Sequence, residues 1–174
     1  MRASALRLTT PLVVGLVVFA AAGCTYQSTP EAPPPTQAVY SPPPDGLGDE
    51  ATRAWSTWQA SGVDDYHYVL SIRCFCPVVT NAKVTVVNGE VVVLDATKDE
   101  RSFIRSVLTG PPTVESLFRK IAEAEQAADN VSLTFNDAAG VPTALNIDYA
   151  DNGTDDELYI EVSKFGRGSW PLIN

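Results

Sequence analysis

Two cysteines separated by one residue are the side chains of this 174-residue sequence best suited to covalent chemistry. Cys74 and Cys76 flank Phe75, and Pro77 follows directly. Such a pair can form a disulfide, act as a redox-active dithiol, or remain as buried thiols or ligands of a soft metal ion. Alternate residues of a regular strand lie about 6.6 Å apart, at the upper limit of the Cα separation that a disulfide accepts. A disulfide between them therefore requires the chain to bend at Phe75.

A second group that could bind a ligand is a cluster of carboxylates near the C-terminus. Carboxylate oxygens in a turn are the hard ligands that Ca²⁺ prefers. Gly153 comes too early in this segment for the twelve-residue calcium-binding loop, so a solvated hairpin turn is the competing interpretation. The candidate metal ligands are Asp148, Asp151, Asp155, Asp156 and Glu157.

The single histidine, His67, completes no catalytic or metal-binding set in the sequence. A Ser-His-Asp triad would have to use it, and the chain has no Gly-x-Ser-x-Gly motif. One histidine cannot form the histidine clusters of catalytic zinc sites. We therefore expect His67 to lie on a sheet face, and we favour a protein that is not an enzyme and needs no cofactor.

Residues 1–23 have the layout of a secretory signal peptide. A basic start and the apolar residues 11–22 precede Gly23 and Cys24. The apolar run is shorter than the roughly 20 residues that a membrane-spanning helix needs. Residues 21–24 resemble the cleavage motif of bacterial lipoproteins, in which the cysteine sulfur carries a diacylglyceryl group. We therefore expect cleavage before an acylated Cys24, which attaches the protein to the lipid bilayer.

Residues 24–50 are expected to form a tether between the acylated cysteine and a single folded domain, residues 51–174. Seven of the thirteen prolines lie in this segment. Because proline fixes φ and lacks an amide donor, the tether should be extended and without a core of its own. The domain would face the extracytoplasmic side of the cell membrane, where thiols tend to oxidise. This location favours the disulfide among the interpretations of Cys74 and Cys76.

The charge of the chain limits its partners. The formal net charge is −9, and loss of the two arginines of the signal peptide makes the mature chain still more acidic. An acidic protein lacks the extended cationic surface that neutralises phosphates, which argues against nucleic acid and against anionic lipid headgroups. A protein of the cell envelope is the partner that we expect instead.

Helical spacing of apolar residues marks two segments of the domain. The first runs from Ala51 to Trp58 at i, i+3, i+4 and i+7, and Gly62 stands where a helix C-cap is expected. The second begins at an N-cap, Thr113, and continues through Ala128 with one apolar stripe. That stripe should pack on a sheet.

Strand periodicity accounts for much of the rest of the domain. Residues 65–76 alternate in polarity, and an Asn-Gly pair at 88–89 joins two β-branched runs as a hairpin turn. Three further strands centre on Leu133, Ile147 and Ile160. The order has no β-α-β alternation, so we expect an α+β fold. The prediction is an antiparallel sheet of about six strands with two helices on one face, in the order α-βββ-α-βββ.

Several short motifs are shared with one known family. They are Trp55 with Trp58, Tyr66 with Tyr68, Cys74-Phe75-Cys76-Pro77, Asn88-Gly89, the segments 113–118 and 140–143, and Ile147-Asp148. Through these motifs, residues 51–165 resemble an uncharacterised bacterial lipoprotein domain family. The resemblance implies export and the boundaries of the fold, and it implies no mechanism because the family has no established activity.

We therefore expect a non-enzymatic binding module at the cell envelope, whose ligand the sequence does not identify. The expectation depends on the lack of a catalytic set among the motifs. The alternative is a thiol-redox or metal-handling lipoprotein that uses Cys74 and Cys76.

Overall fold

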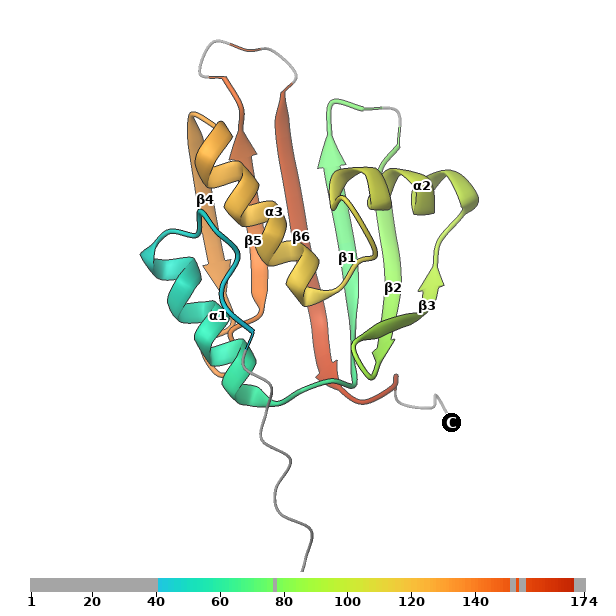
Figure 1. Ribbon diagram of the computed structural model, residues 1–174. Coiled ribbons are helices and arrows are strands. Elements are labelled where there is room, and N and C mark those ends of the chain that lie inside the picture. The colour runs from blue at the N-terminus through green and yellow to red at the C-terminus, as the bar shows by residue number, and fades with distance from the viewer. Residues whose placement is uncertain (1–40, 77, 151–152, 154–155, 171–174) are drawn as a thin grey trace, which may run out of the picture. The chain divides into compact units, whose positions relative to one another are not determined.

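A six-stranded antiparallel sheet with three helices on one face makes up the part of the chain that the structure describes (Figure 1). The computed structural model describes residues 41–76, 78–150, 153 and 156–170. The strand order across the sheet is β3-β2-β1-β6-β5-β4. Along the chain the elements are α1 (Asp49–Ser61), β1 (Tyr66–Cys74), β2 (Thr80–Val87), β3 (Glu90–Asp95), α2 (Lys98–Val107), α3 (Val114–Ala127), β4 (Asn130–Phe135), β5 (Pro142–Asp148) and β6 (Glu157–Arg167).

The expected α+β class and antiparallel sheet are confirmed, and helix α2 is an addition to the expected order. The chain runs α-βββ-αα-βββ, so three helices rather than two cover the sheet. Helix α2 starts with a capping box, in which Thr97 Oγ1 accepts from Glu100 N and Glu100 Oε2 accepts from Thr97 N. These contacts lower the pKa of Glu100. Ile104 of α2 is buried, and Phe103 and Val107 also pack against the core, so the helix covers the sheet with one apolar side.

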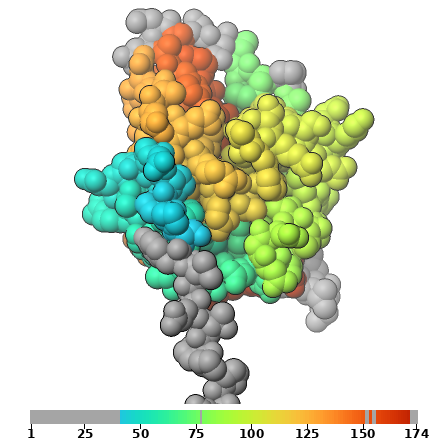
Figure 2. All heavy atoms as spheres, in the orientation of Figure 1, coloured from blue at the N-terminus to red at the C-terminus, as the bar shows by residue number. Residues whose placement is uncertain are grey.

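The core lies between the sheet and the helices, which cover the face drawn in Figure 2. Alternate residues of the strands point into it, as period-two patterning requires. Every second residue of β1 points into the core and is at most 1% exposed: Tyr66, Tyr68, Leu70 and Ile72. The largest fully buried side chains are Tyr66, Tyr68, Phe118, Leu70, Ile72, Ile104, Leu108, Leu117, Ile121, Leu145, Ile147 and Ile160.

Two buried tyrosines connect β1 to the start of α3. Tyr68 Oη donates to the carbonyl oxygen of Pro112 at 2.7 Å, and Tyr66 Oη accepts from Val114 N at 3.0 Å. Val114 is the first residue of α3, where the helix itself offers its amide no partner. Desolvation by burial raises the pKa of both tyrosines well above the ordinary value of 10.0. Both rings therefore stay neutral in the folded protein at physiological pH.

The segment before α1 is fixed to the helices. Trp55 Nε1 donates to the carbonyl oxygen of Ser41 at 3.1 Å. Gly48, the N-cap of α1, has no side chain that could cap the helix, and its amide donates instead to Glu125 Oε2 of α3 at 2.6 Å. The end of the expected tether is thus part of the compact unit, Gln37–Asn174.

The opposite face of the sheet bears no helix within the described ranges (Figure 1). Its side chains are largely polar: Ser71 of β1 is in register with Asn81 of β2 and with Glu161 of β6. Among the described helices, none has the length and apolar character needed to cross a membrane. The expected signal peptide and Cys24 lie outside the described residues.

Candidate functional site

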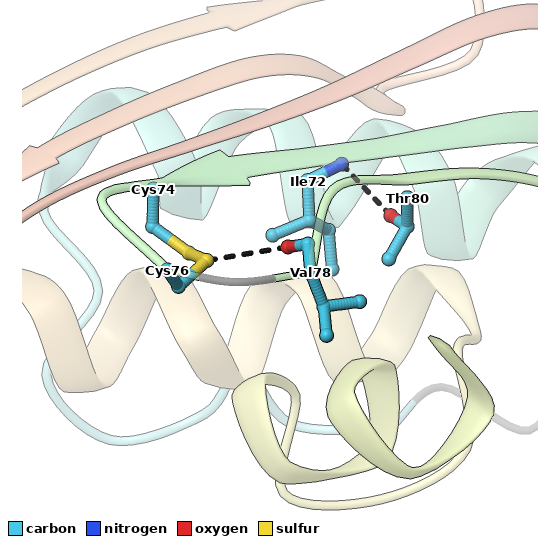
Figure 3. Close-up of a disulfide and its surroundings, with 5 residues drawn as sticks. All are labelled: Ile72, Cys74, Cys76, Val78 and Thr80. Atoms are coloured by element: carbon cyan, nitrogen blue, oxygen red, sulfur yellow. Dashed lines mark hydrogen bonds between the residues drawn. A yellow bond between two sulfur atoms is a disulfide. The ribbon is translucent and has the colours of Figure 1, made fainter. Parts of the chain in front are cut away.

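The structure contains a disulfide between Cys74 and Cys76 at the end of β1 (Figure 3). Their Cα atoms are 5.1 Å apart, closer than the roughly 6.6 Å between alternate residues of a regular strand. The chain therefore bends at Phe75, as a disulfide between these cysteines requires. The bend ends β1, and the disulfide closes a ring that consists of Cys74, Phe75 and Cys76.

Cys76 has a close contact besides the disulfide. Its Sγ atom lies 3.2 Å from the carbonyl oxygen of Val78, as the dashed line in Figure 3 marks. A sulfur atom in a disulfide carries no proton, so in the oxidised protein this is a contact and not a hydrogen bond. After reduction, the thiol of Cys76 would have this oxygen as an acceptor.

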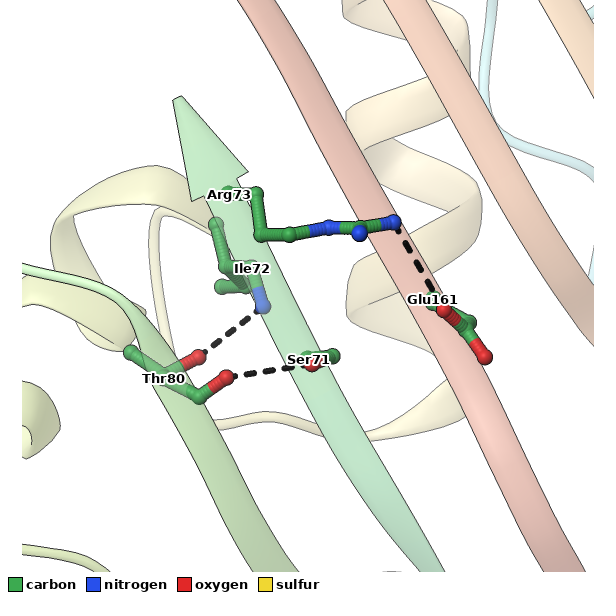
Figure 4. Close-up of polar contacts among 5 residues, drawn as sticks. All are labelled: Ser71, Ile72, Arg73, Thr80 and Glu161. Atoms are coloured by element: carbon green, nitrogen blue, oxygen red, sulfur yellow. Dashed lines mark hydrogen bonds and ion pairs between the residues drawn. The ribbon is translucent and has the colours of Figure 1, made fainter. Parts of the chain in front are cut away.

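Thr80 fixes the other side of the connection between β1 and β2. Its Oγ1 atom accepts from Ile72 N at 3.0 Å, and its carbonyl oxygen accepts from Ser71 Oγ at 3.1 Å (Figure 4). Thr80 is fully buried, so these hydrogen bonds are shielded from competing water. The connection is thus held by the disulfide at one side and by Thr80 at the other.

A hollow of about 340 Å³ lies beside the disulfide. Two exposed aromatic side chains border it: Phe75 is 78% exposed and Tyr159 of β6 is 42% exposed. Arg73 of β1 lies opposite Tyr159 in the sheet register, which brings the two strands together at this site. The complete lining is Arg73, Cys74, Phe75, Glu157 and Tyr159. Adjacent aromatic exposure of this kind is typical of an interaction surface.

The charges at this hollow are accessible to a partner. Arg73 Nη2 lies 3.7 Å from Glu161 Oε2 (Figure 4), and both side chains are more than half exposed. Such an exposed ion pair contributes little to stability. The hollow therefore offers one guanidinium group, the carboxylate of Glu157 and two aromatic rings.

His67 lies at the other end of β1 and is covered. Its Nδ1 atom is 2.8 Å from the carbonyl oxygen of Gly168, and its ring centroid is 4.3 Å from that of Trp170. A Cβ atom added at Gly166 would lie 2.7 Å from the imidazole ring, so the glycine permits this close approach. His67 is only 7% exposed. It is separated from Cys74 by the length of β1, so the two residues form no common site.

The described part of the acidic turn forms no cation site. Asp151 and Asp155 lie outside the described residues. Asp148 Oδ1 accepts from Ala150 N at 3.3 Å, and Asp156 Oδ1 is buried without a hydrogen-bond partner among the described atoms. Within the part of the chain that the structure describes, no three His, Cys, Asp or Glu side chains lie together as metal ligands would.

The fold and the disulfide-closed strand end define a small α+β domain with one face of its sheet left open. Residues 50–167 match the DUF6174 family, a family of unknown function, and the chain belongs to it. No curated protein and no solved structure matches the chain. The family match runs from α1 to the end of β6, so it supports the boundaries of the domain and names no activity.

The two exposed aromatic residues were missed by the sequence reasoning. Tyr159 stands between Leu158 and Ile160, which both point into the core, so the alternation of β6 already placed it on the opposite face. The alternation of residues 65–76 likewise placed Phe75 on the face opposite Ile72 and Cys74. Its position between two cysteines was a further indication of an unusual backbone.

Proposed function

We propose that the chain is a lipid-anchored binding module of the cell envelope, attached through Cys24 on the extracytoplasmic side, which contacts an envelope protein at the Phe75 hollow. The exposure of Phe75, 78%, on a disulfide-closed ring carries the proposal. Large aromatic side chains dominate binding energy at protein interfaces. The ring also limits the backbone freedom that would be lost on binding.

The position of the hollow supports the same proposal. Ser41, where the described chain begins, contacts Trp55 and Gln59 in the second half of α1. Helix α1 ends and β1 begins at the same end of the sheet (Figure 1), and the nine residues of β1 then extend over about 27 Å to Cys74. A domain tethered through Ser41 would present the Phe75 hollow at its far end.

Site-specific cross-linking in membranes tests the binding function. A photoreactive phenylalanine at position 75 should give one defined adduct, and the same group at Val93, an exposed position elsewhere on the sheet, should not. Excess unmodified domain should compete the adduct away, whereas excess F75S domain should not. Equal competition by the wild-type and F75S domains would show that Phe75 is not the contact.

Fractionation of cells tests the proposed membrane location and the lipid anchor at Cys24. The wild-type chain should remain with the membranes, and its mature N-terminus should be an acylated Cys24 in mass spectrometry. The C24S variant should lose the lipid and leave the membrane fraction. Retention of C24S as firm as that of the wild type would reject the lipid anchor.

The second candidate function is thiol-disulfide exchange. It is favoured by the incomplete burial of Cys74 and Cys76 and by the open hollow that Cys74 lines. A glutathione thiolate would attack one sulfur of the pair and form a mixed disulfide, and the other cysteine would leave as a thiolate. A second glutathione would then release the dithiol protein and oxidised glutathione. Metal handling would use the same two sulfurs in their reduced state.

A redox titration separates the two functions. Residues 37–174 are equilibrated with glutathione buffers, and the fraction of reduced Cys74 and Cys76 is measured by thiol alkylation and mass spectrometry. A structural bond should stay oxidised at potentials down to about −300 mV. Reduction at the milder potentials of glutathione buffers would favour the redox function over the binding module.

A further inference from the structure

A second hollow lies on the helix-covered face, between α2 and the β2–β3 hairpin (Figure 2). Its volume of about 490 Å³ falls in the range of about 300–1,000 Å³ that is usual for small-molecule sites. Apolar side chains from β3 and from the segment before α3 form its floor: Val91, Val92, Leu94, Pro111 and Pro112. A ligand that covers these apolar side chains removes them from water, which favours binding.

Val92 reaches this hollow because β3 contains a β-bulge. Thr85 of β2 is paired with Val93, whereas the next residue, Val86, is paired with Val91, so Val92 has no cross-strand partner. A bulge of this kind redirects a side chain out of the regular alternation. Val92 is 57% exposed and lines the hollow, while its neighbour Val93 is 47% exposed and does not line it.

Two guanidinium groups of α2 border the same hollow. Arg101 and Arg105 are four residues apart, which places them on one side of the helix. Arg101 Nη1 donates to the carbonyl oxygen of Leu94 at 3.4 Å, and the side chain of Arg105 has no hydrogen bond or ion pair within the described residues. Glu90 is the single carboxylate of the lining. An acidic protein thus has a local cationic edge above an apolar floor.

We infer that this hollow binds an acidic amphiphile, a monomeric ligand with one carboxylate on an aliphatic body, as in a fatty acid. The guanidinium groups would bind the carboxylate through charge-assisted hydrogen bonds, and the aliphatic body would cover Val92 and Pro111, which are both exposed. A small inorganic anion would leave the floor in water, and a neutral hydrocarbon would leave the arginines without a partner. The inference is independent of the proposed contact at Phe75, which lies at a different hollow.

Calorimetric titration with decanoate, below its critical micelle concentration, tests the site in residues 37–174. Decanoate should bind one to one, while acetate and 1-decanol should bind at least tenfold more weakly. R101Q and R105Q should each weaken decanoate binding about tenfold. K98Q is the matched control, because Lys98 carries the same charge on the same helix but does not line the hollow; its affinity should change less than twofold.

The apolar floor is tested by a second pair of variants. V92S should weaken decanoate binding severalfold, and V93S, the adjacent exposed valine outside the hollow, should leave it unchanged. Equal binding by R105Q and wild type, equal effects of V92S and V93S, or 1-decanol binding as tight as decanoate would overturn the inference. Lack of decanoate binding at millimolar concentration would also overturn it.

Discussion

The two ends of β1 are held in place by different means. At the start of the strand, Tyr66 and Tyr68 are buried and make hydrogen bonds near the start of α3, and Trp58 packs edge-on against Tyr66 with ring centroids 5.3 Å apart. At the end of the strand, Phe75 is exposed and the disulfide at Cys74 replaces packing as the constraint.

The difference teaches how one strand can serve both stability and recognition. Buried aromatic rings stabilise the fold, but they are inaccessible to any partner. A covalent ring needs no burial to remain ordered, so it can hold Phe75 in water in a defined place. Substitutions at the start of β1 should therefore lower the stability of the fold. Substitutions at the end of β1, around Phe75, should mainly alter contacts with a partner.

The largest expected effect is that of Tyr68→Ala at the buried end. Loss of a fully buried ring should lower the free energy of unfolding by about 3–5 kcal/mol, because it creates a cavity and leaves the Pro112 carbonyl oxygen without its donor. Urea unfolding of residues 37–174 measures the change. The matched control, Tyr159→Ala at the exposed end, should change stability by no more than about 0.5 kcal/mol. Equal costs at both positions would contradict the comparison.

The second-largest expected effect is the loss of stability that alkaline pH causes at the buried start of β1. The folded-state pKa of Tyr66 and Tyr68 is raised above the ordinary value of 10.0, so the unfolded chain releases their protons first. Their contribution to stability is complete below pH 10 and is lost as pH rises above it, by about 1 kcal/mol per group for each pH unit. Urea unfolding between pH 8 and pH 11 measures this slope. A Y66F/Y68F variant with an undiminished slope would refute the assignment.

Removal of the disulfide should have a smaller effect on stability. Cys74→Ser with Cys76→Ser should lower the free energy of unfolding by about 1.5 kcal/mol, because closure of so short a loop restrains few unfolded conformations. The same urea measurement, with the reduced wild type as control, gives the value. A loss as large as that of Tyr68→Ala would mean that the ring supports the core as well as the strand end.

The smallest expected effect is that of Phe75→Ser. Because this side chain is mostly in water, its replacement should change the free energy of unfolding by no more than about 0.5 kcal/mol. Excess F75S domain should nevertheless fail to compete for the cross-link that the photoreactive residue at position 75 makes to an envelope partner. A clear loss of stability in F75S would show that Phe75 packs against the domain and would remove it as a contact residue.

Local patterns predicted most elements of this fold. The Asn88-Gly89 pair has positive φ at both residues, as a tight hairpin turn requires, and it joins β2 to β3. Helix α1 buries the expected residues and ends at Gly62 in the left-handed conformation, and Thr113 caps α3. These features are encoded within a few residues of sequence, so they are readable without the tertiary structure.

The features that were missed are of two kinds. For α2 the local signals were present but unused: the capping-box pattern from Thr97 to Glu100 and the helical spacing of Phe103, Ile104 and Val107. The others depend on contacts between distant segments. The pairing of β1 with β6 joins segments far apart in sequence. The burial of His67 by Trp170 depends on that pairing, and so does the hollow beside Phe75. The second hollow is formed by α2, the β2–β3 hairpin and the segment before α3.

The contacts of the N-terminal segment determine where a pulling force would enter the domain. Tension on the chain at Ser41 is taken first by its hydrogen bonds to Trp55 and Gln59, then by the bond from Gln126 to Asp45, and then by the bond from Gly48 to Glu125. None of these bonds belongs to the strand ladder. A stretched N-terminal chain would therefore detach from the helices one bond at a time, while the sheet and its disulfide carry little of the load.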